Sequence, residues 1–244
     1  MQQRRSTPRE PAPPVAPGVI TRIAPTQRDP ERVSVFIDET FAFALPAILV
    51  AQRGLKRGDD LDEDAVRELE GIAVAERATE AALTFVSYRP RSEREVRDRL
   101  RRRAYPPAAI DYAIEKLRGW RYLDDKGFAE FWVENRVEHS PRGRRALASE
   151  LAAKGVDRTV AGEVLDNAEL NEEAAALELA RKRLRSLANL DPQTRRRRLS
   201  DYLARRGYGW DVVRPVLREV LDETDDDDER SADDGAGPLP SHAS

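Results

Sequence analysis

The sequence predicts a mainly α-helical protein of three tandem three-helix (helix-turn-helix-like) repeats, preceded by a small three-stranded antiparallel β meander. Two observations lead to this fold class. Apolar residues recur at helical spacing almost continuously from Asp62 to residue 222. Three stretches, beginning at Ser92, Ser140 and Asp191, can also be laid over one another. Because neighbouring repeats complete their cores only by stacking, we expect an elongated, curved array.

The N-terminal part reads as a tail followed by a β-rich extension. Residues 1–17 are rich in Pro and poor in large apolar side chains, so we expect them to be disordered. Three β-branched and aromatic runs follow from Gly18 (GVITRIA, VSVFID and FAFAL), and their tight connections predict the meander. We expect Ile48, Leu49 and Val50 to cover one face of this sheet. The extension, with its short helices, is predicted to span 18–71.

The repeats share apolar positions in the same order. Each has a pair of apolar residues, then a break, then a second pair, which predicts two helices joined at a turn where Gly takes the left-handed conformation. A third helix precedes each pair. The first pairs are Val96 and Leu100, Leu147 and Leu151, and Leu199 and Leu203; the breaks are Ala104-Tyr105, Gly155-Val156 and Gly207-Tyr208. We place the repeats at 72–123, 124–170 and 171–222, and a disordered acidic tail at 223–244.

Capping residues support these boundaries. Ser92 with Glu95 has the spacing of a capping box. Ser140 and Asp191 each stand immediately before a Pro, as an N-cap does before a Pro at the first helical position. We expect Asp124 to cap the next helix, with Leu123 and Phe128 as a hydrophobic staple. The alternative for Asp124-Asp125, a paired acid and base or a metal site, is weaker than this capping role.

Composition excludes several function classes. The 244 residues include no Cys and only two His, which removes disulfides, thiolate metal sites, Cys nucleophiles and His-based metal clusters. We therefore expect no cofactor, no metal and no catalytic residues. The chain also lacks the apolar stretch of a signal peptide or membrane span, so we expect a cytoplasmic protein with no membrane contact.

The net charge of −3 conceals strongly basic segments. Residues 89–121 carry 11 Lys and Arg against 5 Asp and Glu, and residues 181–206 carry 10 against 2. One interpretation is a solvated helix face; the other, which we favour, is contact with phosphates or an acidic protein surface. The candidate contacts are Arg94, Arg97, Arg101, Arg102, Arg103, Arg142, Arg144, Arg145, Arg195, Arg196, Arg197, Arg198, Arg205 and Arg206. Most aromatic residues are expected to pack in the core or between repeats; Trp120 and Trp210, in turns beside basic helices, are the candidates for stacking on bases.

Several motifs resemble the RecX regulatory proteins, bacterial modulators of the RecA recombinase. They are the Arg91-Ser92-Glu93 start, LRGWRYLDDKGFAEFWVENR from Leu117, PRG from Pro141, LAAKGV from Leu151 and LARRGYGWDVVRPVL from Leu203. The resemblance runs from about residue 18 to 222. Ala104 departs from it, because the family usually has Gly there, and we expect this helix end to differ in geometry. The family motif residues are Ser92, Tyr122, Leu123, Asp124, Asp125, Phe128, Gly155, Gly207 and Tyr208.

The resemblance implies a non-enzymatic protein that binds the RecA filament on single-stranded DNA. Such a protein limits filament growth or promotes disassembly, and so lowers ATP hydrolysis, strand exchange and the SOS response. ATP and Mg²⁺ would belong to the partner, since this sequence has no GxxxxGK[ST] loop. We expect a monomer. The alternative is a helix-turn-helix transcriptional regulator that binds duplex DNA.

Overall fold

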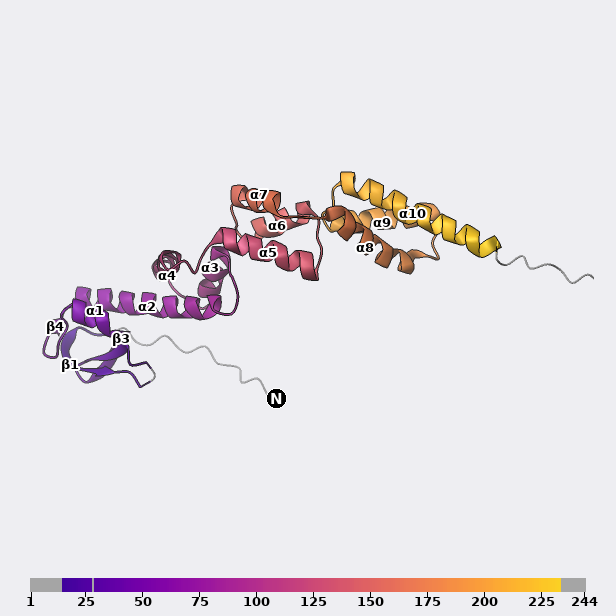
Figure 1. Cartoon of the computed structure of the whole chain (residues 1–244). Helices are drawn as coiled ribbons and strands as arrows, with labels where there is room; N and C mark the ends of the chain where they lie inside the picture. The colour runs from indigo at the N-terminus through magenta and orange to yellow at the C-terminus, as the bar shows by residue number, and fades with distance from the viewer. Residues whose placement is uncertain (1–14, 28, 234–244) are drawn as a thin grey trace, which may run out of the picture. The chain divides into compact units, whose positions relative to one another are not determined.

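The computed structural model describes residues 15–27 and 29–233, without the side chains of 223–233 (Figure 1). The chain divides into two compact units. One contains Met1–Arg89 and Val96–Tyr122, and the other contains Pro90–Glu95 and Leu123–Ser244. The division falls inside a helix, so the first turn of that helix belongs to the second unit.

The first unit begins with an antiparallel sheet of four strands in the order β3-β2-β1-β4. The strands are β1 (Gly18–Pro25), β2 (Arg32–Ile37), β3 (Thr40–Pro46) and β4 (Asp60–Leu61). The three-stranded meander is therefore confirmed and extended, because the short β4 pairs with the start of β1. Because β4 has only two residues, it shows no alternation of apolar and polar side chains by which the sequence could reveal it. Asp38 and Glu39 both have positive φ, as a two-residue hairpin between β2 and β3 requires.

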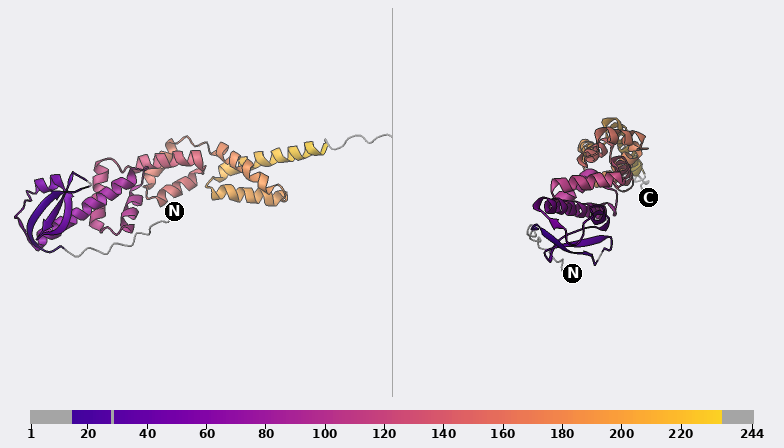
Figure 2. Two further views of the ribbon diagram at one scale, coloured as in Figure 1. Left: turned by 90° about the horizontal axis from the view of Figure 1, so that it is seen from below. Right: turned by 90° about the vertical axis from the view of Figure 1, so that its left-hand side faces the viewer.

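A long helix, α2 (Glu63–Val86), covers the sheet together with the short α1 (Ala47–Gln52). Figure 2 shows the indigo strands beside these helices. The core holds Ile20, Val35 and Leu45 of the sheet, with Val66 and Leu69 of α2. The prediction that Ile48, Leu49 and Val50 of α1 cover the sheet is only partly correct. Val50 is buried and Leu49 half-buried, whereas Ile48 is 67% exposed. A single turn-and-a-half of helix buries one face only, and α2 supplies the rest.

Three-helix repeats follow as predicted. Repeat 1 is α2, α3 (Glu93–Arg102) and α4 (Pro107–Gly119); repeat 2 is α5 (Asp125–His139), α6 (Arg144–Ala153) and α7 (Arg158–Asn167). Repeat 3 is α8 (Glu172–Leu184), a short 3-10 turn at Arg185–Leu187, α9 (Pro192–Arg205) and α10 (Trp210–Asp233). The matched apolar pairs of the middle helices are all fully buried: Val96, Leu100, Leu147, Leu151, Leu199 and Leu203.

The middle helix of each repeat ends in the same turn. Ala104, Gly155 and Gly207 have φ values of 59°, 85° and 89°. In each turn the following N–H donates to the carbonyl of the last buried Leu, as in Tyr208 to Leu203 at 3.3 Å. The prediction of a left-handed turn is confirmed, but the expectation that Ala104 changes the geometry is wrong. Ala104 adopts the left-handed conformation at a cost of about 1 kcal/mol relative to Gly.

Most of the capping predictions are confirmed. Asp124 and Asp191 accept hydrogen bonds from backbone N–H groups in the first turns of α5 and α9, and Asp62, for which no cap was predicted, does the same for α2. Ser92 Oγ accepts from Glu95 N at 3.2 Å, while Glu95 Oε1 accepts from Lys154 Nζ. Leu123 and Phe128 are both buried.

The prediction that Ser140 caps α6 is wrong. Ser140 ends α5, and α6 begins only at Arg144, with Gly143 as its N-cap. Gly143 makes no side-chain cap, and Glu172 of α8 accepts the Arg144 N–H at 2.7 Å instead. A distant carboxylate thus does what a local hydroxyl was expected to do, and local spacing carries no signal for it.

The last helix, α10, continues to Asp233 and so includes the first residues of the acidic tail predicted at 223–244. Buried residues in its first half include Val213, Val216 and Val220. Once a helix is nucleated by such packing, each further residue adds a hydrogen bond at little cost. The predictions of disorder for residues 1–14 and 234–244 concern segments outside the described residues.

Candidate partner-binding surface

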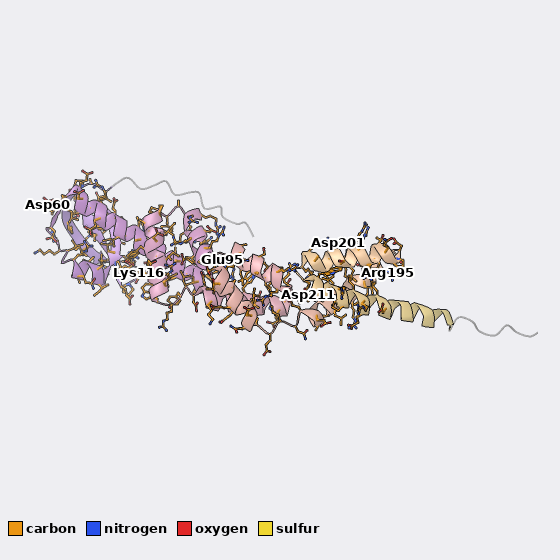
Figure 3. All side chains as sticks on the ribbon, turned by 90° about the horizontal axis from the view of Figure 1, so that it is seen from above. Asp60, Glu95, Lys116, Arg195, Asp201 and Asp211 are labelled. Carbon is orange, nitrogen blue, oxygen red and sulfur yellow. The ribbon has the colours of Figure 1, made fainter. Side chains whose placement is uncertain are left out.

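Several of the predicted contact arginines are exposed, and their side chains make no hydrogen bond or ion pair with other described residues. We call these the free arginines: Arg94, Arg102, Arg103, Arg145, Arg196, Arg197, Arg198 and Arg205. Arg196 to Arg198 follow one another on α9, and Figure 3 labels Arg195 and Asp201 on the same helix. Because an unpaired guanidinium keeps all its donors available, these side chains are suited to bind oxyanions in two-pronged fashion.

The remaining predicted arginines have partners inside the fold. Arg97 pairs with Asp111 and Arg101 with Asp98, at 2.5 and 3.0 Å. Arg142 lies 3.7 Å from Glu150. Arg195 donates to the carbonyls of Ala188 and Leu190. Arg206 donates to the Pro141 carbonyl and stands over the Tyr202 ring.

Arg144 has a structural position at the junction of three helices. Its guanidinium donates to the Leu165 carbonyl at 2.7 Å and pairs with Asp166, while its backbone N–H is bound by Glu172. It therefore ties α6 to the end of α7 and the start of α8. Replacing it would affect the fold first, which makes Arg144 a poor choice for a binding test.

The two tryptophans singled out in the sequence are exposed, and so are several other aromatic residues. Trp120 and Trp210 are 49% and 58% exposed, and Tyr122, a family motif residue, is 57% exposed. Tyr208 is buried in the core of repeat 3 and Tyr202 is half-buried against it. An exposed Trp beside basic helices offers a flat face on which an unpaired base stacks favourably.

The glycine turns join consecutive repeats within the second unit. Ser92 Oγ donates to the Lys154 carbonyl at 2.7 Å, and a Cβ on Gly155 would come within 2.8 Å of Arg94 Cβ. In the same way Gly143 N donates to the Arg206 carbonyl at 3.0 Å, and a Cβ on Gly207 would overlap Ala146. The start of one middle helix thus rests on the turn that ends the next. Ser92, Gly155 and Gly207 serve packing between repeats.

A second contact in that unit surrounds Trp132, whose polar surroundings the sequence pattern does not indicate. Lys154 Nζ and the Arg136 guanidinium stand 4.7 and 4.3 Å from the ring centroid. Trp132 Nε1 and Arg136 Nε both donate to Glu150 Oε2. The indole is therefore held by cation–π contacts and a charge-assisted hydrogen bond, a structural role.

The described residues contain neither a metal-binding group of three or more His, Cys, Asp or Glu side chains nor a helix suited to cross a membrane. Asp124 caps α5 through Lys126 N, and Asp125 Oδ1 lies 3.5 Å from Glu93 N. These two carboxylates therefore bind backbone amides.

Models of the RecX family match four segments of this chain. The model of the regulatory protein RecX N-terminal domain matches residues 18–62. Models of the first, second and third three-helix domains match residues 78–117, 124–165 and 171–217.

Relatives and solved structures agree with these matches. Regulatory protein RecX of Bacillus velezensis is 35% identical over 214 residues, which cover 87% of this chain and 81% of that protein. Regulatory protein RecX of Clostridium botulinum (strain Eklund 17B / Type B) is 31% identical over 205 residues, covering 83% and 96%. A crystal structure of regulatory protein RecX has a TM-score of 0.70 at 22% identity and covers 84% of this chain and 98% of its own; this likeness shows the fold.

Proposed function

This chain belongs to the RecX family of regulatory proteins, and on that premise we propose that it binds the RecA filament on single-stranded DNA and lowers the filament's ATPase and strand exchange. Through them it would lower the SOS response. The observation that carries this proposal is the set of free arginines, above all Arg196 to Arg198 on α9. The protein acts by binding, and the hydrolysed ATP belongs to its partner.

The free arginines favour a partner that presents phosphates. An exposed guanidinium that makes no internal ion pair gains most from an oxyanion, because no existing contact has to be broken. Displacement of counterions from single-stranded DNA adds a favourable term that falls with rising salt. The exposed Trp210, at the start of α10, and Arg205, at the end of α9, flank the Gly207 turn, so a base and a phosphate could be bound on either side of it.

The DNA-dependent ATPase of RecA tests the proposal directly. Substoichiometric protein is expected to lower the steady-state rate, because blocking one filament site affects many protomers. An unchanged rate at equimolar protein would contradict the proposal. Footprinting separates the alternative: a defined duplex site protected without RecA would favour a transcriptional regulator.

The triple variant Arg196→Ala, Arg197→Ala, Arg198→Ala tests the role of α9. If each side chain neutralises one phosphate, the negative slope of log affinity for single-stranded DNA against log salt should become shallower by about 2. A matched control replaces Arg158, Arg214 and Arg218, which are also exposed, make no ion pair among described residues and lie outside the predicted contacts. Equal slopes for the two triple variants would show that α9 has no special part in DNA contact.

A further inference from the structure

A groove of about 450 Å³ opens on repeat 2, between the first and third helices of that repeat. Its apolar residues include Val133 and Val164, both buried, and Val137, which is 49% exposed. Three glutamates line it as well: Glu130, Glu134 and Glu169. Glu130, Glu134 and Val137 lie three and four residues apart along α5 and so share one side of the helix.

An ion pair joins the first and third helices in each of the other two repeats, with the cation on the third helix in repeat 1 and on the first helix in repeat 3. In repeat 1, Lys116 Nζ of α4 binds Glu76 Oε1 of α2 at 2.7 Å, and Tyr112 donates to the same oxygen (Figure 3 labels Lys116). Burial alone would lower the pKa of Lys116, but its hydrogen bonds with Glu76 and Tyr112 raise it, so the ammonium stays charged. In repeat 3, Arg181 of α8 binds Glu219 of α10 at 3.2 Å.

Within the described residues of repeat 2, no ion pair joins α5 to α7. Ile114 of α4 and Val164 of α7 are both buried and occupy matching positions in the two repeats. Two residues after each of them, repeat 1 has Lys116 and repeat 2 has Asp166. Asp166 is a carboxylate and is already paired with Arg144. The groove of repeat 2 therefore has the carboxylates of such an interface without its cation.

This charge pattern defines the chemistry of an occupant. Three carboxylates around an apolar surface repel one another and repel phosphates, so nucleic acid is disfavoured at this place. A Lys or Arg from another molecule would supply the missing cation, and apolar side chains beside it would cover Val133, Val137 and Val164. An amphipathic segment of a protein carries both kinds of residue.

We infer that the groove of repeat 2 binds a segment of RecA that carries Lys or Arg next to apolar side chains. This inference rests on the proposed function and assigns a separate surface to each component of the filament. The acidic groove holds the recombinase, and the free arginines hold the DNA.

A charge-reversal pair tests the inference. The groove pair, Glu130→Lys with Glu134→Lys, places two cations against the basic segment. The control pair, Glu163→Lys with Glu173→Lys, makes the same change in net charge at exposed positions outside the groove. Binding is measured by fluorescence anisotropy, to a labelled dT oligomer alone and to RecA assembled on that oligomer. Both pairs should bind the bare oligomer equally, because their net charges are equal. Only the groove pair should lose affinity for the filament, by about tenfold or more.

An uncharged variant guards against a general charge effect. Val137→Gln removes the exposed apolar rim without altering charge, and it is expected to weaken filament binding several-fold while far-UV circular dichroism stays unchanged. If the groove pair and the control pair bind the filament alike, the groove inference is overturned and the proposed function stands. If the wild-type chain itself fails to bind the filament, both are overturned.

Discussion

Replacing Gly207 by Ala places a methyl group where repeats 2 and 3 meet. Gly207 has a φ of 89°, and an L-residue held in the left-handed region costs about 1 kcal/mol. The new Cβ would also overlap the N and Cβ of Ala146 and come within 2.8 Å of its Cα. Overpacking of this kind costs about 1–3 kcal/mol, so the free energy of unfolding should fall by about 2–4 kcal/mol in total.

Urea titration followed by far-UV circular dichroism measures this loss. The control is Gly162→Ala, inside α7, where a Cβ meets nothing within 4 Å. That variant should gain about 0.5–1 kcal/mol, because Ala is the better helix former. If Gly207→Ala loses no more than about 1 kcal/mol, the left-handed turn alone explains it and the tight contact with Ala146 is refuted.

Three further predictions concern stability. Ala104→Gly should raise the free energy of unfolding by up to about 1 kcal/mol in a urea titration, because Ala104 has a φ of 59°; a loss would contradict this. Leu151→Ala should cost about 2–5 kcal/mol by the same method, because Leu151 is fully buried. Burial raises the pKa of the Tyr208 hydroxyl to about 12. The folded state therefore favours the protonated form, and this contribution is present below about pH 10 and lost as pH rises toward 12. Tyr208→Phe removes this titration, so the stability of wild type relative to the variant should fall between about pH 10 and pH 12, and a constant difference would refute it.

Much of the fold follows from local signals in the sequence. Apolar spacing identifies the helices because a packed helix must bury one side, and the matched pairs from Val96 to Leu203 are all buried. Asp124 and Asp191 identify helix starts because their carboxylates bind backbone amides within three residues. These interactions are short in sequence, and so a pattern reveals them.

Contacts between distant residues escape such patterns. Glu172 binds the first turn of α6 from another repeat, and nothing near Ser140 reveals that the helix starts later. The strand β4 exists because β1 offers it an edge. Arginine runs locate basic segments, but only the fold separates Arg144, which is held by Leu165 and Asp166, from the exposed Arg145. The acidic groove is hidden in the same way, since Glu169 joins Glu130 and Glu134 only through folding.

The contacts between consecutive repeats also form in a fixed order while the chain is being synthesised. Ser92 is bound by Lys154, 62 residues later, and Gly143 is bound by Arg206. Each middle helix therefore finds the partner for its first turn only after most of the next repeat has been synthesised. At about 5–20 residues per second, the wait is about 3–12 s. In a chain interrupted between residues 160 and 200, Ser92 at the start of α3 could already bind Lys154, whereas Gly143 at the start of α6 would still lack Arg206.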